Sequence, residues 1–254
     1  MPQFYLPRPW EIQNPTSLTP ELVHHLRVRR IPIGESFPVF DGKGHVGIAK
    51  LLTLSNKSGQ VQLSGIQANL LRESTYGITL AQGLAGGDKM DWIVEKAVET
   101  GVQAIVPLQC ERSVIKLTRA GDSGRAEKRI SHWQAITQAA CEQCERTVLP
   151  SIEPIQTIER FVSQVKPSQL KVLLSPQATE NFSAILARTP PQDITLMIGP
   201  EGGLTPEEEA LATAAGFVLA SLGERVLRTE TAGIVAISAV HTLWNPELQN
   251  FLNQ

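Results

Sequence analysis

The stretch ITLMIGPEGGLTPEEE, residues 194–209, contains the strongest structural signal in the sequence. Ile194 to Ile198 form a short apolar run, which is typical of a central strand in a parallel sheet. Three glycines follow within five residues, and then Thr205 and Glu208 form a capping box with Pro206 at the first helical position. The stretch therefore predicts a strand, a glycine loop and a helix. Because ligands of open parallel sheets bind beyond the carboxyl ends of the strands, the loop is a candidate site for a small molecule.

Two common nucleotide sites are excluded by the spacing of these glycines. The loop at residues 199–203 does not have the G-x-G-x-x-G pattern of dinucleotide-binding folds, and the sequence contains no G-x-x-x-x-G-K-[ST] pattern of phosphate loops. A glycine loop between a strand and a helix is also often a simple turn. From these residues alone, a ligand site and a structural turn both stay open.

A second loop strengthens the case for a ligand. Phe217 to Leu222 are predicted to form another strand, followed by GERVLRTETA, residues 223–232, and an apolar last helix. Thr229 or Thr231 is expected to cap this helix. Arg228 and Glu230 flank the turn, where they could act on a ligand or form a salt bridge that only holds the loop.

The rest of the chain predicts two domains. From Gly77 onward strands and helices alternate, which favours an α/β fold with a parallel sheet; Asp88 is expected to cap the first helix of this part. Residues 31–66 instead show short strand patterns separated by turns, and a helix is predicted over residues 19–30, with Thr19 as its cap and Pro20 at its first helical position. We predict a small N-terminal β-barrel over residues 1–72 and an α/β domain over residues 73–254.

The composition is that of an ordinary globular protein: 254 residues, 42% hydrophobic and 19% charged. No apolar run reaches the roughly 20 residues that a membrane helix needs, and the start lacks a secretory signal, so we expect a cytoplasmic protein with no membrane partner. Three cysteines form no disulfide framework. Cys141 and Cys144 have C-x-x-C spacing, but no second ligand pair accompanies them, so no metal is expected.

The charge is distributed unevenly. Residues 1–74 carry eight Lys and Arg against five Asp and Glu, whereas the remainder carries fifteen against twenty. Arg27, Arg29 and Arg30 lie within four residues, which could make a phosphate-binding patch or an ordinary solvated face.

The two C-terminal loops resemble those of a known family. GPEGG (199–203) and LGERVLRTETA (222–232) resemble the cofactor-binding loops of the SPOUT methyltransferases, and more narrowly of the subfamily that methylates N3 of a uridine in 16S ribosomal RNA. Further similar segments are GDKM (87–90), ERSV (111–114) and EQCER (142–146), and HLRV (25–28) and FDGKG (40–44) resemble the subfamily's PUA-like RNA-binding module. Ala85-Gly86 departs from the Pro-Lys pair of the subfamily, which puts a phosphate contact there in doubt.

This resemblance implies a C-terminal domain tied into a deep trefoil knot, a rare exception to the rule that chains are unknotted. It also implies a homodimer that binds S-adenosylmethionine and acts on 16S rRNA in the small ribosomal subunit. The implied cofactor-binding residues are Leu174, Ser175, Ile198, Gly199, Pro200, Glu201, Gly203, Leu222, Gly223, Val226, Leu227, Arg228, Thr231 and Ala232. The implied RNA-binding residues are Arg8, Arg27, Arg29 and Arg30.

For the reaction, the expected catalytic residues are Arg228 and Glu230. Arg228 could stabilise negative charge on a uracil oxygen, while Glu230 could orient Arg228 or accept the N3 proton. Three alternatives remain: a SPOUT enzyme acting on a ribose hydroxyl or a transfer RNA guanine, a non-catalytic ribosome-assembly factor, and a metal or redox protein using Cys141 and Cys144.

Overall fold

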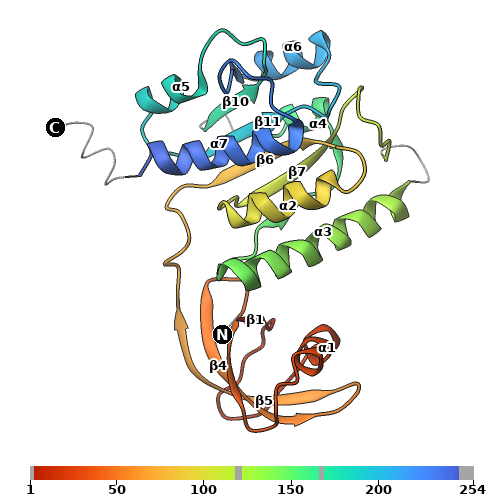
Figure 1. Cartoon of the computed structure of the whole chain (residues 1–254), viewed down its shortest axis with the longest axis vertical. Coiled ribbons are helices and arrows are strands. Elements are labelled where there is room, and N and C mark those ends of the chain that lie inside the picture. The colour runs from red at the N-terminus through yellow and green to blue at the C-terminus, as the bar shows by residue number, and fades with distance from the viewer. Residues whose placement is uncertain (1–2, 118–121, 166–168, 246–254) are drawn as a thin grey trace, which may run out of the picture. The chain divides into compact units, whose positions relative to one another are not determined.

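The computed structural model describes residues 3–117, 122–165 and 169–245, and the chain divides into two compact units. Unit 1 comprises Met1–Glu73 and Gln138–Leu149, and unit 2 comprises Ser74–Thr137 and Pro150–Gln254. Figure 1 shows the elements of both units.

Unit 1 is built on a five-stranded sheet in the order β1-β3-β4-β5-β2. The elements are β1 (Phe4–Tyr5), β2 (Thr16–Ser17), α1 (Pro20–Val28), β3 (Ser36–Phe40), β4 (His45–Leu54) and β5 (Gly59–Ala68). As predicted, α1 starts at Pro20, and the hydroxyl of Thr19 accepts a hydrogen bond from the Leu22 N–H. Apolar residues of α1 join those of the strands in one buried core, so the helix covers the inner side of the sheet.

A segment distant in sequence completes unit 1. The last residues of α3 (Ser123–Cys144) and the loop that follows them belong to this unit. Arg146 and Glu73, both largely buried, form an ion pair of 2.7 Å, and the Gln3 side chain donates to the Arg146 carbonyl at 2.7 Å. Breaking a buried pair of this kind leaves an uncompensated charge, so residues 138–149 are an integral part of unit 1.

Unit 2 contains the predicted parallel sheet, in the order β12-β10-β11-β6-β7-β8, with β9 also paired to β7. Its strands are β6 (Ile78–Gly83), β7 (Ala104–Gln109), β8 (Ser151–Ile152), β9 (Gln156–Thr157), β10 (Leu170–Leu174), β11 (Ile194–Ile198) and β12 (Val218–Ala220). β11 lies between β10 and β6, so the strand order reverses direction there. This reversal is the position at which open α/β sheets bind ligands.

Helices cover both faces of this sheet (Figure 1). They are α2 (Lys89–Glu99), the first part of α3, α4 (Ile158–Val162), α5 (Phe182–Arg188), α6 (Pro206–Ala214) and α7 (Thr229–Leu243). α2 and α7 contact each other on one face, whereas α4 and α6 share a core with Val106, Leu173 and Met197 on the other.

One predicted helix cap is confirmed in position only, and another is wrong. Asp88 is the N-cap residue of α2, as predicted, but its side chain makes no capping hydrogen bond, because its backbone lies near φ −84° and ψ 3° rather than in the extended region. Thr229 and Thr231 lie inside α7, whose N-cap residue is Arg228. No helix within the described ranges is long and apolar enough to cross a membrane.

Candidate active site

A pocket of about 700 Å³ lies at the carboxyl ends of β10, β11 and β12. Its walls are the three loops that follow these strands, together with residues from the starts of α2, α6 and α7. The lining residues are Lys89, Arg112, Leu174, Ser175, Pro176, Gln177, Ile198, Gly199, Pro200, Glu201, Gly202, Gly203, Leu204, Pro206, Glu209, Ala220, Leu222, Gly223, Arg225, Val226, Leu227, Arg228, Thr229, Glu230 and Ala232. The volume is within the range of small-molecule sites, about 300–1,000 Å³.

The glycine loop after β11 is tightly folded against its neighbours. Gly203 has φ +69°, and its N–H donates to the Pro200 carbonyl at 2.9 Å. A Cβ on Gly199 would lie 3.0 Å from the Gly203 carbonyl carbon, and one on Gly83 would lie 2.5 Å from the Pro200 nitrogen. Larger residues at Gly199 or Gly83 would therefore push the loop outward and change the shape of the pocket.

Glu201 ties this loop to the start of α2. Its Oε1 accepts hydrogen bonds from Lys89 Nζ at 2.9 Å and from the Gly86 N–H at 3.0 Å. Burial acts to raise the pKa of the Glu201 carboxyl, but these hydrogen bonds outweigh it and hold the pKa below its usual value. Glu201 is consequently ionised at neutral pH and serves to hold the loop.

Arg112 holds the opposite side of the loop. Its Nη1 donates to the carbonyl oxygens of Gly202 and Leu204, both at 3.1 Å. The predicted capping box of α6 is confirmed, since the Thr205 hydroxyl accepts from the Glu208 N–H and the Glu208 carboxylate accepts from the Thr205 N–H. The loop is thus fixed at both ends before any ligand binds.

Arg228 and Glu230 stand at the third loop in very different environments. The Arg228 side chain is 83% exposed, whereas that of Glu230 is 14% exposed. Their closest charged atoms, Arg228 Nη1 and Glu230 Oε1, are 3.9 Å apart, and Glu230 Oε2 is buried without a hydrogen-bond partner. The predicted salt bridge is therefore loose, leaving the guanidinium free to reach a ligand and one carboxylate oxygen available as an acceptor.

The structure gathers most of the predicted cofactor-binding residues around this one pocket. Among the fourteen, only Thr231 is absent from the lining. The Thr231 N–H donates to the Arg228 carbonyl, so Thr231 belongs to the first turn of α7 and does not line the pocket.

The sequence reasoning also missed lining residues. Lys89 and Arg112 occur in segments quoted for the family resemblance, yet they were given no role, since their partners are 112 and 90 residues away in sequence. Arg225, an exposed residue between two predicted positions, was likewise overlooked.

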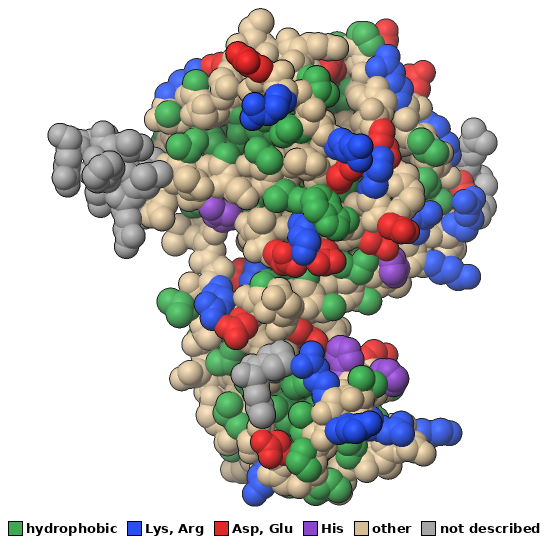
Figure 2. All heavy atoms as spheres, viewed as in Figure 1, with side chains coloured by type: hydrophobic (Ala, Val, Ile, Leu, Met, Phe, Trp, Pro, Cys, Tyr) green, Lys and Arg blue, Asp and Glu red, His purple; other side chains and the backbone are tan. Residues whose placement is uncertain are grey.

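The four arginines predicted to bind RNA are in unit 1. Arg27, Arg29 and Arg30 are exposed at the end of α1, where basic side chains gather on the surface in Figure 2. Arg8 is more constrained, because its Nε donates to Asp41 at 2.6 Å and its guanidinium lies 5.3 Å from the centre of the Trp10 ring. A contact of these residues with RNA stays a prediction.

Metal and redox chemistry find no support in the part of the chain that the structure describes. No group of three or more possible metal ligands occurs among the described residues. Burial raises the pKa of the Cys141 thiol to about 12, which suppresses the thiolate that redox chemistry needs.

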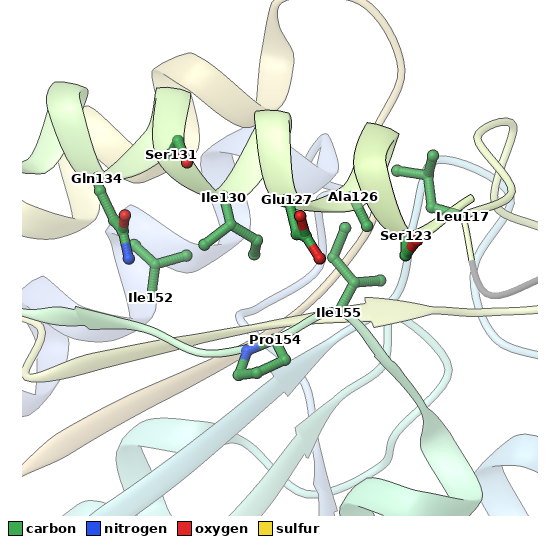
Figure 3. Close-up of a pocket in the computed structure, with 10 residues that line it drawn as sticks. All are labelled: Leu117, Ser123, Ala126, Glu127, Ile130, Ser131, Gln134, Ile152, Pro154 and Ile155. Carbon is green, nitrogen blue, oxygen red and sulfur yellow. The ribbon is translucent and has the colours of Figure 1, made fainter. Parts of the chain in front are cut away.

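A second pocket, of about 550 Å³, lies between α3 and Ile152–Ile155 (Figure 3). Its walls are mostly apolar, and none of the predicted site residues lines it.

Comparisons with known proteins agree with this geometry. The family described as an RNA methyltransferase domain matches residues 72–241, and the one described as an RNA methyltransferase PUA domain matches residues 18–64. Ribosomal RNA small subunit methyltransferase E of Bacillus subtilis is 32% identical, over 88% of this chain and 88% of the relative. The protein of the same name from Synechocystis is 34% identical, over 91% of this chain and 74% of the relative.

Solved structures extend the similarity to the fold. Ribosomal RNA small subunit methyltransferase E from Neisseria gonorrhoeae, bound to S-adenosyl methionine, superposes with a TM-score of 0.86 at 37% identity, covering 96% of this chain and 98% of its own. A Legionella pneumophila protein in complex with the same cofactor gives a TM-score of 0.87 at 33% identity, covering 95% and 97%.

The two family matches identify the chain as an RNA methyltransferase that carries a PUA domain. Within that class, the chain belongs to the family of ribosomal RNA small subunit methyltransferase E proteins. The family resemblance drawn from the two C-terminal loops is thereby confirmed.

Proposed function

We propose that the protein transfers a methyl group from S-adenosylmethionine to N3 of a specific uridine in the 16S rRNA of the small ribosomal subunit. The observation that carries this proposal is the pocket at the carboxyl edge of the sheet, which is lined by a fixed glycine loop, an exposed arginine and a largely buried carboxylate. The names of the relatives support the substrate class, and the cofactor in two similar structures supports the methyl donor.

The residues of the pocket fit S-adenosylmethionine. A Cβ at Gly199 would meet neighbouring atoms of the loop, and its absence leaves the loop backbone accessible to a ligand. The pocket wall combines apolar side chains with backbone polar groups, which suits an adenine ring. We assign cofactor binding to the predicted residues that line the pocket, and we retain Thr231 as a prediction only. When bound, the cofactor supplies a methyl group on a positively charged sulfur.

The chain's own residues must then position the base and manage one proton. Uracil N3 loses its proton when it accepts the methyl group, and negative charge develops on the neighbouring oxygens. Arg228 is exposed at the pocket mouth and stabilises this charge, while Glu230 holds an unpartnered oxygen that accepts the proton or orients Arg228. Positioning of the nucleophile supplies the larger share of the reduction in the activation barrier, on the order of 7–11 kcal/mol for well-aligned groups.

We assign RNA binding to the basic surface of unit 1. N3 lies on the Watson–Crick edge, so the uridine must be unpaired or flipped out before it reaches the pocket. We propose that residues 1–72 form the RNA-binding PUA-like domain and residues 73–254 the catalytic domain, of which residues 138–149 pack as part of unit 1. Arg8, Arg27, Arg29 and Arg30 would contact phosphates, which position the RNA without reading its sequence.

Four further properties belong to this proposal. The family resemblance supports a deep trefoil knot in the C-terminal domain, a homodimer, and a cytoplasmic location. The chain is also proposed to work without a metal ion, since positioning and charge stabilisation account for the chemistry.

The test is methyl transfer from labelled S-adenosylmethionine to small ribosomal subunits that lack the modification, followed by mass analysis of the nucleosides. We expect label in 3-methyluridine. Label in a 2′-O-methylated nucleoside or in a methylguanosine would assign the pocket to a different RNA target. Cofactor binding without transfer to any ribosomal RNA would favour an assembly factor.

A further inference from the structure

One side chain beneath the glycine loop is buried outside the pocket lining. Gln82, near the end of β6, has no exposed surface and pairs in register with Ile198 of β11. Its Nε2 donates to the Gly83 carbonyl at 3.0 Å and to the Thr229 hydroxyl at 2.8 Å. Gln82 therefore joins the end of one strand to the first residue of α7.

The donor and the acceptor of each hydrogen bond around Gln82 are determined by the groups present. Both hydrogens of its Nε2 are used, and the Thr229 hydroxyl, having accepted one of them, donates its own to the Gly199 carbonyl at 2.6 Å. Turning the amide round would place its oxygen against the Gly83 carbonyl, where two acceptors would repel. The order Gln82 to Thr229 to Gly199 is thus fixed by donors and acceptors.

This chain of hydrogen bonds connects the two parts of the candidate site. Thr229 lies between Arg228 and Glu230, and Gly199 begins the glycine loop. One turn further along α7, a Cβ on Gly233 would lie 3.5 Å from Ile198 Cδ1, so the helix already touches β11 closely. The hydrogen bond from the Thr229 hydroxyl to the Gly199 carbonyl adds a polar contact between α7 and this strand end. It fixes the distance between the Arg228–Glu230 turn and the glycine loop.

Fold stability alone gives little reason for a glutamine at this position. Gln82 Oε1 is buried and has no hydrogen-bond partner. A buried acceptor left unmet destabilises the folded state, whereas an apolar side chain of similar shape would remove that cost. The amide is better explained by what its nitrogen does for Thr229.

We propose that Gln82 is a positioning residue for methyl transfer, acting through Thr229 to hold the Arg228–Glu230 turn in register with the glycine loop. This inference rests on the proposed function, because it assigns the turn to catalysis. Gln82 itself is fully buried and does not line the pocket.

The test compares variants that keep or lose the hydrogen-bond chain. Gln82→Met keeps the size of the side chain, and Thr229→Val keeps the shape but loses the hydroxyl, whereas Thr229→Ser retains the hydroxyl. We expect Gln82→Met and Thr229→Val to lower kcat by about tenfold to a hundredfold, a typical result of misplacing a reacting group. The melting temperature of Gln82→Met should be unchanged or higher, and Thr229→Ser should keep most of the activity.

A similar pair at the other end of the sheet provides the control. The Gln169 side chain donates to the Thr195 hydroxyl at the start of β11, so Gln169→Met removes the same kind of bond away from the pocket. The inference is overturned if Gln82→Met keeps full kcat, if Gln169→Met loses as much, or if Thr229→Ser behaves like Thr229→Val. An inactive wild-type protein would instead count against the proposed function.

The double variant Gln82→Met/Thr229→Val sharpens the test. Because the two residues act in one chain, its kcat should be no lower than that of Thr229→Val alone. Losses that multiply would show that Gln82 acts independently of Thr229 and would contradict the proposal.

Discussion

Asp41 in unit 1 is a buried carboxylate near an arginine, and Glu230 in unit 2 is a largely buried one. The Asp41 carboxylate accepts hydrogen bonds from Arg8 Nε at 2.6 Å, from the Lys43 N–H at 2.7 Å and from the His45 N–H at 3.0 Å. Glu230 has Arg228 at 3.9 Å and one oxygen with no partner. The comparison separates a carboxylate that stabilises a turn from one that is left available for a substrate.

The largest effect is expected from the arginine at the pocket. Arg228→Ala should lower kcat by about a hundredfold to a thousandfold, the usual cost of removing a group that stabilises developing charge. Binding of S-adenosylmethionine, measured by calorimetry, should weaken far less than kcat falls, because the Arg228 side chain is 83% exposed in the free protein and many other residues line the pocket. Normal turnover with cofactor bound would remove Arg228 from the mechanism.

Glu230→Gln should have the next largest effect. The amide keeps the size of the side chain but cannot accept the N3 proton, so kcat should fall by about a hundredfold, within the range for general base catalysis. Single-turnover transfer at saturating RNA is the appropriate measurement. If Glu230 only orients Arg228, the loss should be much smaller and the pH dependence of the rate unchanged.

Asp41→Asn should affect stability rather than chemistry. The substitution weakens several charge-assisted hydrogen bonds in unit 1, and the expected loss is about 2–3 kcal/mol of unfolding free energy. Thermal and urea unfolding measure it. Unchanged stability would contradict the structural role assigned to this carboxylate.

The same group predicts a pH dependence. Burial acts to raise the pKa of Asp41, but hydrogen bonds from Arg8, Lys43 and His45 outweigh it and hold the pKa below the ordinary 3.8. Because the pKa of Asp41 is lowered in the folded state, its contribution to the unfolding free energy is complete above the pKa of the unfolded state and is lost as the pH falls through the folded-state pKa. The difference in unfolding free energy between the wild type and Asp41→Asn should therefore disappear below about pH 4.

The smallest effect is expected at α1. Arg27→Ala and Arg30→Ala should each weaken RNA binding a few-fold and reduce the slope of log K against log salt by about one. Arg188→Ala, which removes an exposed arginine of α5 paired with Glu180, is the control. An unchanged salt slope in the α1 variants would leave these arginines as an ordinary solvated face.

The sequence predicted the parts of the site whose signals are local. The strand over 194–198, the glycine loop and the capping box of Thr205 and Glu208 all follow from neighbouring residues, and all are found in the structure. The order of strands does not follow in this way, because insertion of β11 between β10 and β6 depends on contacts between distant segments.

Long-range polar contacts explain most of what was missed. Arg112 contacts the glycine loop across 90 residues, and Arg146 pairs with Glu73 across 73, so neither partner could be read from spacing. The capping error at Thr229 has a related cause. Its hydroxyl donates to Gly199, 30 residues away, and the tertiary contact overrides the local preference for a cap.

The most direct test of this account measures two properties on two variants. Unfolding free energy and single-turnover methyl transfer at saturating RNA are determined for Asp41→Asn and Glu230→Gln beside the wild type. We predict that Asp41→Asn loses stability and keeps its rate of transfer, whereas Glu230→Gln keeps its stability and loses its rate. A Glu230→Gln protein that transfers methyl groups as fast as the wild type would contradict the assignment of the unpartnered carboxylate to catalysis.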